Sequence, residues 1–84
     1  MPHLQDILNE IKWTKHLKDT EIWYLHRGAP NNTKIISGSE ITAIGRSFLE
    51  TTTATIPYHR ITKIFYKGEI LFDRWELSHH DKQL

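Results

Sequence analysis

The chain contains no cysteine. This absence excludes disulfide bonds and metal sites held by thiolates. Long apolar runs are missing too, since nothing approaches the ~20 apolar residues of a membrane-spanning helix. No N-terminal segment resembles a signal peptide either. We therefore expect a cytoplasmic protein with no part in the membrane.

The chain also lacks a clear excess of either positive or negative charge. Lys and Arg total 11 and Asp and Glu total 10, so the formal net charge is +1 with neutral histidines. A protein that follows a nucleic-acid backbone usually carries a clear basic excess, because such binding depends on releasing counterions from many phosphates. Any contact with nucleic acid should then be local, at a few placed cations.

The length of 84 residues leaves room for one hydrophobic core and no second domain. Hydrophobic residues make up 38% of the chain and include three each of Trp, Tyr and Phe, far above the composition of a disordered segment. We predict one monomeric domain over residues 1–76 and a flexible polar tail over residues 77–84.

An amphipathic helix is predicted over residues 3–13. Leu4, Ile7, Leu8 and Ile11 recur with the period of 3.6 residues that places them on one face. Trp13 lies off this apolar stripe, and we expect it to fold back as the chain leaves the helix.

From Glu21 onward the apolar pattern changes to a period of two. Short β-branched and aromatic segments alternate with Gly, Pro and Asn, which is typical of strands and turns. The clearest hairpin joins residues 60–66 to residues 69–75 through Lys67-Gly68, where glycine supplies a positive φ. The sequence thus predicts an α+β fold, with the helix packed on a mostly antiparallel sheet of about five short strands.

The residues of a self-sufficient enzyme are missing. The acids occur singly, no glycine-rich loop with a lysine is present to hold phosphate, and the six histidines show no metal-binding spacing. We predict no catalytic residue, no metal and no cofactor, and therefore a binding domain.

Two similar tripeptides stand out as a candidate binding site. His26-Arg27-Gly28 ends one predicted strand, and Tyr58-His59-Arg60 directly follows Ile56-Pro57. The planar fork of arginine binds phosphate oxygens in pairs, and histidine adds a hydrogen bond. These six residues are predicted to form an anion site.

The residue types alone favour a structural role for the same side chains. An arginine at a strand end commonly pairs with a carboxylate, here Asp73 or Glu69. A histidine beside aromatic residues is more often packed than bound to a ligand. The aromatic residues that either stack on a base or fill the core are Trp23, Tyr24, Tyr58 and Trp75.

At these residues the sequence resembles a known family. The helix over 4–13, the segment 26–30 (His-Arg-Gly-Ala-Pro) and the block 56–61 (Ile-Pro-Tyr-His-Arg-Ile) occur in this order. Gly68, Leu71, Phe72 and Arg74 follow them. Over residues 4–75 the chain is similar to the RNA cyclic group end recognition domain, a small family formerly of unknown function. The role of this family was proposed largely from its fusion to RNA-end-processing enzymes.

The resemblance implies an RNA-binding module that recognises 3′ termini, above all 2′,3′-cyclic phosphate ends, through His26, Arg27, Gly28, Tyr58, His59 and Arg60. It further implies action in trans with an RNA ligase, a phosphoesterase or a nucleotidyltransferase. A cyclic phosphate carries one negative charge, and the last base is free to stack. A few cations and one aromatic ring would then suffice to recognise such an end, which is compatible with the near-neutral net charge of the chain.

Two alternatives stay open. One is a protein–protein adaptor that uses a sheet edge or an aromatic patch. The other is a minimal phosphodiesterase acting through His26 and His59. Known two-histidine phosphoesterases carry His-x-Thr or His-x-Ser, whereas an arginine follows each histidine here, and this departure counts against the second alternative.

Overall fold

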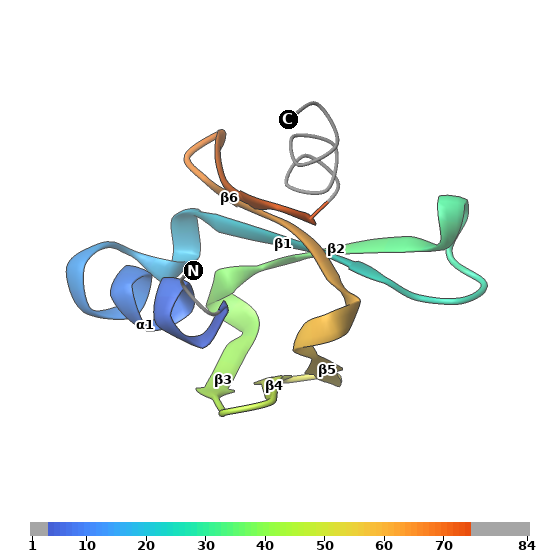
Figure 1. Ribbon diagram of the computed structural model, residues 1–84, viewed down its shortest axis with the longest axis horizontal. Coiled ribbons are helices and arrows are strands. Elements are labelled where there is room, and N and C mark those ends of the chain that lie inside the picture. Colours follow the sequence, from blue (N-terminus) through green and yellow to red (C-terminus); the bar gives the residue numbers. More distant parts are fainter. Residues whose placement is uncertain (1–3, 75–84) are drawn as a thin grey trace, which may run out of the picture.

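The computed structural model describes residues 4–74 (Figure 1). The helix α1 spans Leu4–Thr14, and seven strands follow it: β1 (Thr20–Leu25), β2 (Thr33–Ser37), β3 (Ile41–Ile44), β4 (Phe48–Thr51), β5 (Thr55–Pro57), β6 (Ile61–Tyr66) and β7 (Glu69–Asp73). Four single-turn 3₁₀ helices connect them: η1 (Leu17–Asp19), η2 (Pro30–Asn32), η3 (Gly38–Glu40) and η4 (Tyr58–Arg60). The predicted end of the domain at residue 76 and the predicted tail over 77–84 lie outside the described residues.

The strands form two antiparallel sheets. The larger has the order β2-β1-β6-β7 and the smaller has the order β3-β4-β5. The predicted α+β class is confirmed, with one helix and antiparallel strands in the part of the chain that is described. The prediction of one sheet of about five strands is wrong, because these residues form seven strands in two sheets.

Two turns separate the two sheets, and a third divides two strands within the smaller one. The 3₁₀ turn η3 takes the chain from β2 to β3, and η4 takes it back from β5 to β6. The threonine-rich stretch supplies the third turn, because the Thr51 hydroxyl accepts hydrogen bonds from the N–H groups of Thr53 (3.3 Å) and Ala54 (3.0 Å). That turn joins β4 to its antiparallel partner β5.

The core lies between the inner face of the larger sheet and a layer made of α1 and the smaller sheet, which cover the same side of it (Figure 1). It is built from alternate strand positions and from the apolar stripe of α1, as the two periodicities require. Its buried members are Leu4, Leu8, Ile11, Ile22, Tyr24, Ile36, Leu49, Ile56, Ile61 and Ile64. The helix prediction is therefore confirmed, but Trp13 does not fold back, since 79% of its surface is exposed.

The β6–β7 hairpin has the predicted turn. Lys67 (φ 49°) and Gly68 (φ 85°) both adopt positive φ, which suits the right-handed twist of the flanking strands. Within the described residues, no helix has the length and apolar character needed to span a membrane.

Candidate functional site

The sheet register brings the two His-Arg pairs to one place. β1 and β6 are antiparallel neighbours, with Tyr24 opposite Ile61. The end of one antiparallel strand lies beside the start of the other, so the residues after Leu25 adjoin the residues before Ile61. His26-Arg27 and His59-Arg60 therefore meet at the same end of the larger sheet.

The loop after β1 is held by its own hydrogen bonds. The backbone N–H of His26 donates to the carbonyl of Asn32 (2.8 Å), and the N–H of Gly28 donates to the Asn32 side-chain oxygen (3.4 Å). Gly28 has φ 94°, a conformation that side chains with a Cβ rarely adopt. The glycine thus shapes the loop that presents His26 and Arg27, and this hairpin projects beyond the rest of the domain (Figure 1).

The turn η4 is fixed from two sides. Directly after β7, the Nε of Arg74 donates to the carbonyl of Ile61 and its Nη2 donates to the carbonyl of Tyr58, both at 2.9 Å. From the β3–β4 connection, the carbonyls of Gly45 and Ser47 accept from the Tyr58 hydroxyl (2.6 Å) and the Tyr58 N–H (3.1 Å). The exposed side chains of His59 and Arg60 therefore project from an anchored turn.

These two segments line a hollow of about 680 Å³, which we term the cationic hollow. Its lining residues are Leu25, His26, Arg27, Asn32, His59 and Arg60. The imidazole of His26 lies edge-on to the ring of Tyr24, with the ring centroids 6.3 Å apart. No carboxylate of residues 4–74 lines the hollow, so a chain with a near-neutral total charge concentrates positive charge at this point.

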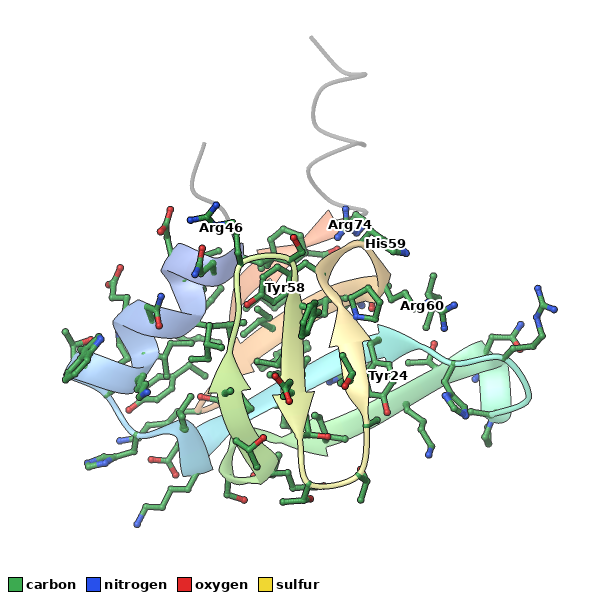
Figure 2. All side chains as sticks on the ribbon, turned by 90° about the horizontal axis from the view of Figure 1, so that it is seen from below. Tyr24, Arg46, Tyr58, His59, Arg60 and Arg74 are labelled. Atoms are coloured by element: carbon green, nitrogen blue, oxygen red, sulfur yellow. The ribbon has the colours of Figure 1, made fainter. Side chains whose placement is uncertain are left out.

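A second hollow of about 430 Å³ shares His59 with the first. It is lined by Leu4, Gln5, Arg46, Tyr58, His59, Phe72 and Arg74. Figure 2 shows His59 between Arg46 on one side and Arg60 on the other. The two hollows thus form one continuous surface around His59.

The arginines divide into two kinds. Within residues 4–74, neither Arg27 nor Arg60 makes a hydrogen bond or an ion pair, so the predicted alternative of pairing with Asp73 or Glu69 is wrong for this part of the chain. Arg74, in contrast, holds two carbonyls and lies over the Phe72 ring at 5.4 Å. Arg74 is a structural residue, whereas the Arg27 and Arg60 guanidinium groups are available to a ligand.

The six predicted site residues do not share one hollow. His26, Arg27, His59 and Arg60 line the cationic hollow, whereas Tyr58 lines the second hollow and Gly28 is not among the lining residues of either. Sequence reasoning assigned no site role to Arg46, Gln5 and Asn32. The only signal for Arg46 is its position beside Gly45 after a strand, which parallels Arg27 beside Gly28.

Both buried phenols near the site stay protonated at neutral pH. Burial raises the pKa of Tyr58, and burial followed by the charge of Glu40 raises the pKa of Tyr24. A neutral phenol donates a hydrogen bond, as Tyr58 does to Gly45, and does not act as a general base. No group of three or more His, Asp or Glu side chains within residues 4–74 is placed to hold a metal ion.

The raised pKa of Tyr58 predicts a loss of stability in alkali. In the unfolded chain tyrosine ionises near pH ~10, below its pKa in the folded state. The contribution of protonated Tyr58 to the free energy of unfolding is therefore complete below pH ~10, and it is lost as the pH rises through the pKa of Tyr58 in the folded state. Tyr58→Phe should lower the free energy of unfolding by about 1 kcal/mol at pH 7 and should reduce the further loss in alkali. Urea denaturation of parent and variant at pH 7 and in alkali measures both effects. If the free energy of unfolding falls as steeply with rising pH in Tyr58→Phe as in the parent, the prediction is wrong.

Comparison with known proteins places the chain in a family. The family model described as the MJ1316 RNA cyclic group end recognition domain matches residues 1–74. The chain belongs to this family. The match includes both hollows and the Arg74 contacts, so the surface around His59 lies within the family's own domain.

Two relatives are similar to this chain over nearly the whole of their own length. A UPF0248 protein of Methanococcus vannielii is 41% identical over 79 residues, which cover 89% of this chain and 95% of the relative. UPF0248 protein MJ1316 of Methanocaldococcus jannaschii is 41% identical over 75 residues, covering 84% and 92%. The names of these relatives state no activity, and no solved structure shows significant similarity. The description of the family model refers to RNA cyclic ends.

Proposed function

We propose that this domain binds RNA 3′ ends that carry a 2′,3′-cyclic phosphate, with the phosphate in the cationic hollow. The observation that carries the proposal is the pair of guanidinium groups of Arg27 and Arg60, which line one hollow together with two histidines; among the residues that the structure describes, neither has a partner and no carboxylate joins them. Charge-assisted bonds from arginine to phosphate are short, and arginine can bind two oxygens at once. The name of the family supports the choice of a cyclic end.

The domain acts in this proposal as a binding module and not as an enzyme. Burial raises the pKa of Tyr24 and of Tyr58, and each histidine of the cationic hollow is followed by arginine instead of the Thr or Ser of two-histidine phosphoesterases. An RNA ligase, a phosphoesterase or a nucleotidyltransferase that acts in trans would carry out the chemistry on the bound end.

The test compares short RNAs of one sequence that end in a hydroxyl, a 3′-phosphate or a 2′,3′-cyclic phosphate. The cyclic end should bind at least about tenfold more tightly than the hydroxyl end, the equivalent of one charge-assisted hydrogen bond. Because few phosphates are neutralised, the dependence on salt should be shallow, with a log–log slope of roughly −0.7 per phosphate. Fluorescence anisotropy over a salt series measures both quantities.

The 3′-phosphate RNA decides how specific the site is. If it binds as tightly as the cyclic end, the hollow is a general site for terminal phosphates. Equal affinity for the hydroxyl and cyclic ends with a steep salt slope would instead indicate unspecific binding to the RNA backbone and would refute the proposal.

A protein–protein adaptor remains the second candidate function because the outer face of the larger sheet carries exposed apolar and aromatic side chains. Ile35 is 53% exposed on β2, and the rings of Trp23 and Phe65 lie 5.3 Å apart on the neighbouring strands β1 and β6. Lys63 lies over the Trp23 ring at 5.2 Å. Failure to bind any of the three RNAs would favour this candidate.

A further inference from the structure

The two hollows that meet at His59 differ in chemistry. The cationic hollow is lined by Leu25 and by five side chains that carry a guanidinium, an imidazole or an amide group. The second hollow adds three apolar or aromatic side chains, Leu4, Tyr58 and Phe72, to the polar groups of Gln5, Arg46, His59 and Arg74. Apolar and aromatic side chains with a few polar groups among them are the usual environment for a planar heterocycle.

We propose that the second hollow holds the base of the terminal nucleotide whose cyclic phosphate occupies the cationic hollow. This proposal rests on the proposed function, because it places another part of the same ligand. In such a nucleotide the base leaves the ribose at C1′ and the phosphate bridges O2′ and O3′, so the two groups lie on either side of the sugar. Two hollows that share His59 in their lining fit a nucleotide of this shape, with the ribose against His59.

Arg46 is the cation that this arrangement assigns to the base. Its side chain is exposed and, among residues 4–74, it makes no hydrogen bond or ion pair. Two nitrogens of Arg74, by comparison, already donate to carbonyls. A free guanidinium stacks on a base or binds its edge, and the half-buried Gln5 amide offers a donor and an acceptor to the same edge.

The experiment uses four ligands: one RNA with a cyclic-phosphate end or a hydroxyl end, each with a normal or an abasic terminal nucleotide. For the parent protein, removal of the last base from the cyclic-end RNA should weaken binding roughly tenfold, within the range for a stacked base. If the abasic cyclic end binds as tightly as the normal one, the base site is overturned while the proposed function stands. If cyclic and hydroxyl ends bind equally, the proposed function fails, and this inference fails with it.

The variant Arg46→Gln connects the effect to the second hollow. It should weaken binding of the normal cyclic-end RNA by several-fold and leave the abasic RNA almost unaffected, because the contact it removes is to the base. Lys18→Gln is the matched control, since it removes one exposed cation that lines neither hollow. An equal loss for the normal and abasic RNAs would show that Arg46 acts as a remote charge and would overturn its assignment.

Discussion

Replacing both Arg27 and Arg60 by glutamine should weaken binding of a cyclic-phosphate RNA end roughly 100-fold. In the proposed complex each guanidinium would donate a charge-assisted hydrogen bond worth about 1.5 kcal/mol, the lower end of the range because both side chains are exposed and screened by solvent. Two such contacts amount to about 3 kcal/mol, or roughly two orders of magnitude in the dissociation constant. Isothermal titration of parent and variant with the same RNA measures the loss.

The control for this double variant is its stability. Neither arginine has a partner within residues 4–74, so the free energy of unfolding should change by less than about 0.5 kcal/mol. The single variant Arg60→Lys keeps the charge but loses the planar fork, and it should therefore lose much of the preference for the cyclic end. A folded double variant that binds as tightly as the parent would remove both arginines from the site.

The parts of the fold that were predicted correctly are those that local sequence determines. The stripe from Leu4 to Ile11 defines α1 by its period, and Lys67-Gly68 defines the β6–β7 hairpin by its need for positive φ. A period of two identifies a strand but does not state which sheet it joins. The division into two sheets depends on η3 and η4, whose single turns leave no periodic signal.

In the candidate site, too, local sequence determined some features and tertiary contacts determined the others. Residue types were enough to single out His26-Arg27 and His59-Arg60, but their meeting depends on the pairing of β1 with β6, two strands far apart in the sequence. The role of Arg74 was not predictable, because its partners are backbone carbonyls that every residue carries. Whether an arginine is structural or free is therefore decided by tertiary contacts.

Arg74→Met should be the most destabilising of the arginine substitutions. The change removes the Arg74 donors from the carbonyls of Tyr58 and Ile61. The Tyr58 carbonyl keeps the backbone N–H of Ile61, and Ile61 itself is fully buried. Two hydrogen bonds to a charged donor, discounted because Arg74 is only half-buried, are together worth about 2–3 kcal/mol. For a domain of this size the midpoint of thermal unfolding should fall by roughly 10–20 °C.

The same substitution should weaken RNA binding at temperatures where the variant is still folded. Without Arg74 the turn η4 keeps its contacts to Gly45 and Ser47 but loses the two hydrogen bonds from the Arg74 side chain, so His59 and Arg60 are held less firmly. Backbone amide shifts should change at residues 58–61 in the variant and stay unchanged there in Arg46→Gln. An Arg74→Met variant with the parent's unfolding free energy would show that the two Arg74 hydrogen bonds do not stabilise the fold, and Arg74 would then have no positioning role.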